Sequence, residues 1–313
     1  MPLLTRKKLL LAKIEAAYGT DSTPTGAANA ILVRNLEIVP LQSDIVQREL
    51  IRPYLGNYEQ LLANTRVQVT FEVELAGSGA AGTPPAYGPI LRSCALSEIA
   101  SASISVTYQP ESELSGFEST TLYFFIDGIR HIITGARGTF TLNGTVGAIP
   151  TIQFTMTGIF NTPTDFALAV PTYANQATPL IFKNGNTTSF SAFSYSGALQ
   201  SIDFNIANEI IYRELIGGTK QVIITDRKPG GTLQIEAVLL ATKNYFTVST
   251  GSTTGSITFQ HGTTAGNIAT LTMAQSDLAD ASYADMNGIT MLNLPYVATP
   301  TAAGNDELSL VFT

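Results

Sequence analysis

The residue types that most often carry chemistry are scarce in this chain of 313 residues. It contains two histidines, His131 and His261, and a single cysteine, Cys94. Both histidines lie beside hairpin-type turns without a cysteine or carboxylate at metal-ligand spacing, so we expect polar surface residues. Cys94 lies in a short helix predicted at 84–96. Its apolar neighbours indicate a small core residue rather than an activated thiol.

The other patterns that could form a catalytic or ligand site are incomplete. GSGAAG at 77–82 lacks the Lys-Ser/Thr of a phosphate loop, and we expect a flexible loop there. Asp277, Asp280 and Asp285 lack the glycine and terminal glutamate of a calcium loop. Carboxylate pairs can hydrolyse glycosidic bonds, but sugar sites favour aromatic platforms and the chain has no Trp. We therefore expect a protein that is not an enzyme and binds no metal or cofactor.

Composition narrows the class of partner. Only 13% of the residues are charged, against about 25% in typical soluble domains, so part of the surface is expected to contact protein. The net charge of −7 argues against electrostatic binding of nucleic acid. A single cysteine fits a reducing compartment. We find neither a signal peptide nor the run of about 18 apolar residues that a membrane span needs, and we expect a cytoplasmic site of synthesis.

One phrase is written twice, as DIVQRELI at 44–51 and EIIYRELI at 209–216. Strand-like segments follow at nearly equal spacing, RVQVTFEVEL at 66–75 and TLQIEAVLL at 232–240. STTLYFFIDG and STTGSITFQHG continue the parallel further along. This order predicts a duplicated domain with a large insertion at about 76–116 in the first copy. The alternative is coincidence among β-rich segments.

The elements predict a mainly β fold of two tandem β-sandwich or barrel domains, each flanked by a short helix. The helices are expected at 84–96 and 239–246. Strand 66–75 alternates apolar and polar residues, and LYFFI at 122–126 indicates a strand buried on both faces. Helical spacing at the N-terminus predicts either a frayed helix or an arm that docks on a neighbour. The expected divisions are an arm at 1–30, domains at 31–165 and 196–313, and a linker at 166–195.

Six segments are characteristic as a set: LLLAKIEAAYGTDSTPTGAANAILVRNLEI, GSGAAGTPPAYGPILRSCAL, ESTTLYFFIDGIRHIITGARGTF, VIITDRKPGG, FQHGTTAGN and GNDELSL. They resemble segments of the major tail tube proteins of long, non-contractile-tailed bacteriophages, and the resemblance covers nearly the whole chain. It implies a tail-tube-type β-sandwich whose inner strands join between subunits into a closed barrel. It further implies stacked rings and a tube through which DNA is ejected.

The resemblance also implies partners and a location. The partners are further copies of the chain, a tape measure protein, tail-tip or baseplate proteins, a tail terminator protein, and phage DNA that passes without specific binding. No membrane is involved. The expected location is the virion tail, assembled in the host bacterial cytoplasm. Family rings commonly hold six single-domain subunits, so a chain with two domains suggests three chains per ring. Six chains per ring is the alternative.

Two sets of residues are candidates for assembly. The repeated Arg-Glu pairs are either exposed ion pairs or charges that fix the register of an adjacent subunit. The loop at 52–65 is apolar, so it either contacts another ring or folds back on its own sheet. The candidates for contacts between subunits or rings are Arg48, Glu49, Tyr54, Leu55, Tyr58, Leu61, Arg213 and Glu214.

The candidates for the lumen are the polar residues of the strand-like segments. A neutral or acidic lining avoids the counterion-release affinity that Lys and Arg would add for DNA. These candidates are Gln68, Thr70, Glu72, Glu74, Gln234 and Glu236. Two other functions fit a β-sandwich, namely a secreted or surface adhesin or carbohydrate-binding module, and a capsid decoration protein. The adhesin would be expected to show a secretion signal and aromatic platforms.

Overall fold

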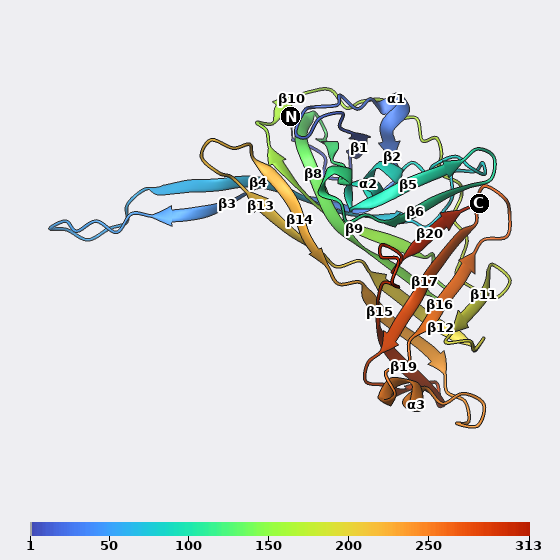
Figure 1. Ribbon diagram of the computed structural model, residues 1–313. Helices are drawn as coiled ribbons and strands as arrows, with labels where there is room; N and C mark the ends of the chain where they lie inside the picture. The colour runs from blue at the N-terminus through green and yellow to red at the C-terminus, as the bar shows by residue number, and fades with distance from the viewer. Residues whose placement is uncertain (1) are drawn as a thin grey trace.

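The computed structural model describes residues 2–313, and it is mainly β, as the sequence predicts. Every pairing between the named strands is antiparallel, and the large sheet is not closed (Figure 1). The helical elements of the described chain are short: α1 (Gly26–Asn29), α2 (Gly88–Ser93), α3 (Tyr245–Thr250) and the 3-10 helix η1 (Leu114–Gly116). The architecture therefore rests on strand pairing and on the packing between strands.

The first half of the chain forms a curved sheet whose strands pair in the order β1, β7, β8, β9, β4, β3. Their bounds are Lys8–Ile14, Thr120–Ile126, Ile129–Thr145, Thr151–Phe160, Gln60–Glu74 and Arg34–Gln47. The strand predicted at 66–75 is the inner part of β4, with Val67, Val69, Phe71 and Val73 buried. The Asp-Gly turn at 127–128 joins β7 and β8, with Gly128 at φ 104°, a conformation that glycine adopts without strain.

The second half shows a corresponding order, β11, β16, β17 with β18, β19, β15, β12. The bounds are Thr187–Ala192, Gly255–His261, Ala269–Leu278, Ser282–Met286, Ile289–Ala298, Gly230–Glu236 and Leu199–Asn205. β17 and β18 both pair with β19, so together they take the position that β8 alone takes beside β9. The hairpin of β13 (Asn208–Arg213) and β14 (Gln221–Arg227) forms a small separate sheet.

Short strands tie the two halves together. β5 (Leu96–Ser101) and β6 (Ser105–Pro110) form a hairpin inside the segment predicted as an insertion, and β6 pairs with the C-terminal strand β20 (Ser309–Phe312). β20 also pairs with β17. β2 (Ala30–Ile31) lies against β1, and β10 (Thr164–Asp165) lies against β8. One large apolar cluster spans both halves, so they share a core.

Four expectations about elements are wrong. Residues 8–14 form β1, a strand, and not a helical arm. Leu9, Leu10, Leu11 and Ala12 are all buried, because β7 and β2 flank β1 and both of its faces are covered. A short continuous apolar run of this kind fits a buried strand as well as a helix.

The other three corrections concern the second half, the first hairpin and the expected linker. The helix expected at 239–246 is α3 and begins only at Tyr245, after Asn244 accepts a hydrogen bond from the backbone N–H of Thr247 as its N-cap. The loop expected at 52–65 is shorter, because β4 already begins at Gln60. In addition, the segment 187–192 within the expected linker is strand β11.

Candidate assembly surfaces

The two halves meet along one strand seam within the chain. β12 uses one edge for β15 and the other for the C-terminal part of β8, from Ser201 opposite Thr145 to Asn205 opposite Thr141. β8 has this edge free there because β7 has already left it after Ala136. The seam therefore joins β12, the outermost strand of the second half, to the long strand β8 of the first half.

Two other strands take the places of β12 and β8 in the opposite halves, namely β3 in the first half and β18 in the second, and both have open edges. β3 pairs with β4 alone among the described residues, and β18 pairs with β19 alone. Both β3 and β12 carry a register shift at their N-terminal ends opposite β4 and β15. An open strand edge is a template for another strand, which soluble proteins usually cover. The chain thus has one open edge at the position of β12, which is β3, and one at the position of β8, which is β18.

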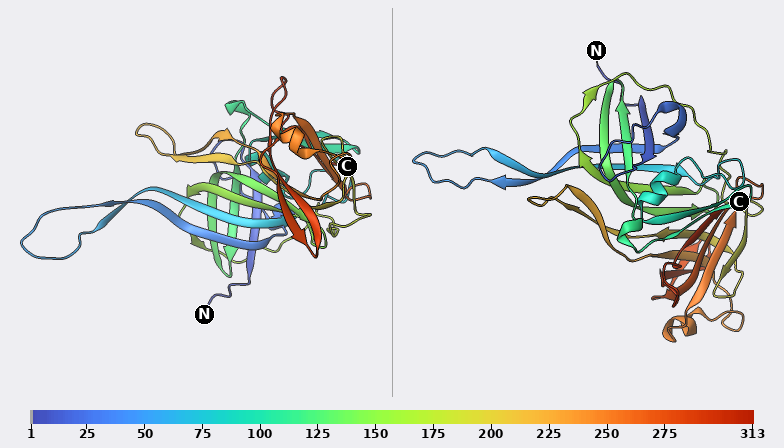
Figure 2. Two further views of the ribbon diagram at one scale, coloured as in Figure 1. Left: turned by 90° about the horizontal axis from the view of Figure 1, so that it is seen from below. Right: turned by 45° about the horizontal axis from the view of Figure 1, so that its top comes forward.

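Two hairpins project from the body in the same direction and run side by side, as both views of Figure 2 show. The β3–β4 hairpin is the longer, and its tip consists of residues 48–59. In that tip the Arg52 guanidinium lies 4.6 Å from the Tyr54 ring centroid and 4.2 Å from that of Tyr58. Cation–π contacts of this kind give the tip a defined shape.

The repeated Arg-Glu pairs do not pair with themselves. Arg48 contacts Glu59 across the hairpin at 3.4 Å, and Glu214 contacts Lys220 across the second hairpin at 3.3 Å. Each of these two ion pairs, Arg48–Glu59 and Glu214–Lys220, therefore lies exposed at the base of a hairpin turn. The apolar residues that follow are also open to solvent: Ile51, Leu55 and Ile216 are fully exposed, and Leu61 is more than half exposed. The apolar tip does not fold back on its own sheet.

Arg137 and Tyr18 hold the β13–β14 hairpin against the first half. The Arg137 guanidinium donates to the carbonyl of Val222 at 3.0 Å and to those of Phe117 and Glu118 at 2.7 and 3.0 Å. The Tyr18 hydroxyl accepts from the Val222 N–H at 2.5 Å and donates to the Gly135 carbonyl. Burial lowers the pKa of Arg137 and raises that of Tyr18. A single residue of the hairpin is thus fixed through both of its backbone groups.

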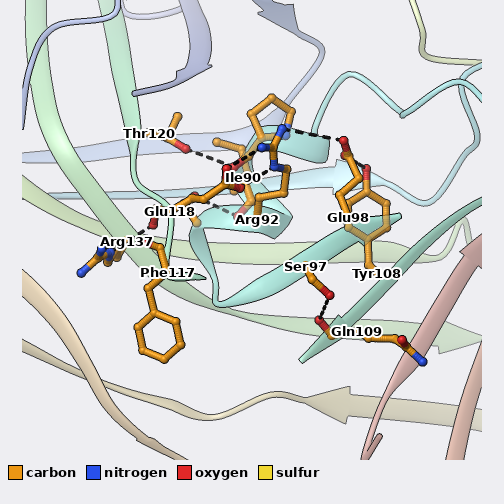
Figure 3. A network of polar contacts seen from close by, with 12 residues as sticks. Ile90, Arg92, Ser97, Glu98, Tyr108, Gln109, Phe117, Glu118, Thr120 and Arg137 are labelled. Atoms are coloured by element: carbon orange, nitrogen blue, oxygen red, sulfur yellow. Dashed lines mark hydrogen bonds and ion pairs between the residues drawn. The ribbon is translucent and has the colours of Figure 1, made fainter. Parts of the chain in front are cut away.

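A second polar network braces residues 117–118, the segment before β7 whose carbonyls Arg137 binds (Figure 3). Arg92 of α2 forms two bonds of 2.5 Å to the Glu118 carboxylate, and it lies 3.7 Å from Glu98. Tyr108 donates to Glu98 at 2.6 Å. Burial, and next the Glu98 charge, raises the pKa of Tyr108. Burial alone would lower the pKa of Arg92, but its bonds to Glu118 raise it overall. Through Glu118 and Arg137, these contacts connect the inserted segment to Val222 of the hairpin.

The lumen candidates lie on the face of the strands opposite the core. Gln68, Thr70, Glu72 and Glu74 are half-buried and alternate with the buried apolar residues of β4. Arg34 lies 4.0 Å from Glu72 and 3.9 Å from Glu74. Cross-strand neighbours share a face, so Thr155 and Gln153 of β9 extend this polar surface.

The corresponding surface of the second half is also polar. Gln234 donates to Asn293 at 2.9 Å, and Glu236 is exposed. The continuous polar surface therefore carries hydroxyl, amide and carboxylate groups and few cations.

The histidines and the cysteine are structural. His261 is buried, contrary to the expected surface position. Its ring bonds Thr187 at 2.9 Å and the Leu180 carbonyl at 3.2 Å and stacks on Phe182. His131 is half-buried with its ring edge-on to Phe124. Cys94 is buried in the core as predicted. Within residues 2–313 no cluster of three or more His, Cys, Asp or Glu could hold a metal ion.

Sequence reasoning missed the residues that fix the halves together. Arg137, Tyr18 and Asn208 all act at the hairpin seam; the Asn208 amide donates to the carbonyls of Cys94 and Gly138. A lone arginine in the otherwise uncharged segment ITGARGTF was the available signal for Arg137. The glycine-rich loop at 77–82 is also not free, since Gly77 and Gly79 bond Asn267 and Gly266 of the second half.

Open strand edges and projecting hairpins with exposed apolar tips are features of a protein that contacts other protein chains. A family model described as phage tail tube protein matches residues 5–312. The chain therefore belongs to the phage tail tube protein family and is a structural component of a phage tail. No curated protein matches the chain. Among the described residues, no helix is long and apolar enough to cross a membrane.

Proposed function

We propose that the chain is a duplicated tail tube domain and that three chains form each ring of the tube. The corresponding order of pairing, β1-β7-β8-β9-β4-β3 and β11-β16-β17/β18-β19-β15-β12, is the observation that carries this proposal. Each chain would supply two neighbouring places in a wall of six similar units. Rings of three chains would then repeat along the tail.

The seam within the chain supplies a template for the seam between chains. Asp203 of β12 lies opposite Asn143 of β8. By strand register, Glu37 of β3 corresponds to Asp203. Glu37 faces Thr70 of β4, and Asp203 accepts from the N–H of Thr232, the residue of β15 in the place of Thr70. The residue that corresponds to Asn143 is Ala284 of β18. Asn143 lies opposite Thr151, which pairs with Glu74, and Ala284 lies opposite Met291, which pairs with Glu236. The β3 edge of one chain then pairs with the β18 edge of the next, with Glu37 opposite Ala284.

This head-to-tail contact closes into a ring when the rotation per chain is a simple fraction of a turn. Closure covers the open edges of β3 and β18 in every chain, which removes the hazard that such edges pose. The alternation on the strands would turn Gln68, Thr70, Glu72, Glu74, Gln234 and Glu236 toward the lumen. An acidic and neutral lining would let DNA pass without counterion-release affinity.

The exposed hairpin tips are suited to contacts between stacked rings. Tyr54, Leu55, Tyr58 and Leu61 are candidates in the first tip, together with Arg48 and Glu49, and Arg213 and Glu214 in the second. The proposed partners of the tube are a tape measure protein, tail-tip or baseplate proteins, a terminator protein and DNA in transit. Assembly in the host bacterial cytoplasm, placement in the virion tail and a role in genome ejection complete the proposal.

A disulfide across the proposed seam tests it. Directly opposed residues of antiparallel strands have Cα atoms about 4.5–5.5 Å apart, within the range that a disulfide spans. The double variant Glu37→Cys/Ala284→Cys, oxidised after assembly, should give a covalent trimer as the largest species on a non-reducing denaturing gel. Bands up to a hexamer would overturn three chains per ring. No cross-link in assembled tubes would overturn the strand seam.

A further inference from the structure

We infer that the β3–β4 hairpin of one chain packs across the second half of the next chain, placing Ile45 and Leu62 on Val297 and the Gln60 amide beside Asp277. The inference rests on the ring proposed above and adds a second contact to the strand seam. Its basis is the position of the other hairpin, which already makes the corresponding contact within the chain.

The β13–β14 hairpin lies across β8, β9 and β4 of the first half. Its inner face is covered there: Val222 is fully buried and Ile224 is nearly so. Val222 lies opposite Tyr212, and Ile224 lies opposite Ile210. The hairpin therefore uses one face of two strands as a docking surface for the neighbouring half.

The β3–β4 hairpin has the same face without a partner. Gln60 to Glu74 of β4 is the same length as Val222 to Glu236 of β14 and β15, so Gln60 takes the place of Val222 and Leu62 that of Ile224. Ile45 lies opposite Leu62 as Ile210 lies opposite Ile224. Yet Ile45 is 55% and Leu62 is 54% exposed. An apolar pair at this position is expected to be covered by protein.

The second half carries a surface in the corresponding place. Arg137 lies opposite Thr157 in the first half, and Asp277 lies opposite Val297 in the second. Val297 is 51% exposed and lines a groove of about 690 Å³ together with β14 residues from Ile224 to Arg227. Within the chain, β13 and β14 lie beside β4 and β9. The β3–β4 hairpin of another chain, placed in the same manner, enters this groove beside β14.

The proposed contact between chains has a polar pair like the one within the chain, but with the donor and the acceptor exchanged. Within the chain, the Arg137 guanidinium donates to the backbone carbonyl of Val222. At the corresponding place Asp277 can only accept, and its Oδ1 is a buried atom without a hydrogen-bond partner in the described chain. Gln60, where Val222 would be, supplies an amide N–H donor. A buried acceptor without a partner is costly, and the next chain removes that cost.

The test uses the Glu37→Cys/Ala284→Cys disulfide as the readout in the full-length chain. Leu62→Glu should reduce the yield of covalent trimer about tenfold or more, because it places a carboxylate in an apolar contact. Val46→Glu is the matched control, since Val46 is 51% exposed beside Ile45 on β3 but points to the opposite face. It should leave the trimer yield unchanged.

A second pair of variants tests the polar contact. Gln60→Glu should lower the trimer yield about tenfold by opposing two carboxylates, and Asp277→Asn should restore it in the Gln60→Glu background. Equal yields for Leu62→Glu and Val46→Glu, or no restoration by Asp277→Asn, would overturn the inference while the disulfide itself still forms. Failure of the parent disulfide in assembled tubes would instead count against the ring seam.

Discussion

Arg137 provides a quantitative test of how the second hairpin is held. It is 8% exposed and donates three hydrogen bonds to the carbonyls of Phe117, Glu118 and Val222. Hydrogen bonds from a charged donor are worth about 1.5 kcal/mol or more each, so the three amount to about 4.5 kcal/mol. Burial of the guanidinium opposes part of this, as its lowered pKa shows.

We expect Arg137→Met to lower the free energy of unfolding by about 2–3 kcal/mol, because methionine keeps much of the apolar stem and loses every donor. The measurement is urea unfolding of the unassembled chain, together with amide hydrogen exchange of β14. The amides between Val222 and Asp226 should lose protection more than those of β4. Arg213→Met is the control, because Arg213 is exposed and makes one side-chain contact, at 3.3 Å to Gln221.

A free energy of unfolding for Arg137→Met within about 0.5 kcal/mol of the unchanged chain, the range expected of a surface substitution, would contradict this role of Arg137. Unchanged amide protection of β14 together with a less stable core would also contradict it. In that case Arg137 would support the first half alone, and the hairpin would be held by its apolar face.

Three further predictions concern other parts of the chain. Glu15→Gln should cost about 2 kcal/mol of stability, because an amide cannot accept all the bonds that the carboxylate receives from Gly19, Ser119, Thr121 and Gly135; an unchanged urea midpoint would contradict this. Burial lowers the pKa of His261 below 6.5, so the unfolded state binds the proton first and stability falls as pH drops through about 6.5. His261→Gln should flatten that fall, and an unchanged pH profile of the midpoint would rule His261 out as its source. Glu72→Lys combined with Glu74→Lys should slow DNA release from assembled virions by adding phosphate contacts, whereas Glu113→Lys, on an exposed turn, should not; equal ejection rates would remove both residues from the lumen.

Local patterns predicted the strands whose two faces differ. Val67, Phe71 and Val73 alternate with polar residues, so the inner part of β4 follows from period alone. The buried strand at 122–126 was also predicted, because its signal lies within a few residues. The helix predicted over Leu9–Ala12 was wrong because local sequence does not decide the conformation there. A strand covered on both faces has no alternation, and only its distant partner β7 decides its conformation.

The site residues depended on contacts that are far apart in sequence. Tyr18 and Val222 are 204 residues apart, and Arg137 and Val222 are 85 apart. No local spacing reports such pairs. The repeated RELI phrases did mark real structure, namely the bases of the two hairpin tips, but Arg48 and Glu214 bond across their turns rather than to their sequence neighbours. The open edges of β3 and β18 likewise depend on which distant strands pair, and no local pattern reports this.

The most direct test of three chains per ring is cryo-electron microscopy of assembled tubes at a resolution that separates strands. We predict rings of three chains with six similar lobes, in which β3 of each chain is hydrogen-bonded to β18 of the next and Glu37 faces Ala284. Rings of six chains, or a β3 edge that meets solvent in the assembled tube, would contradict the proposal.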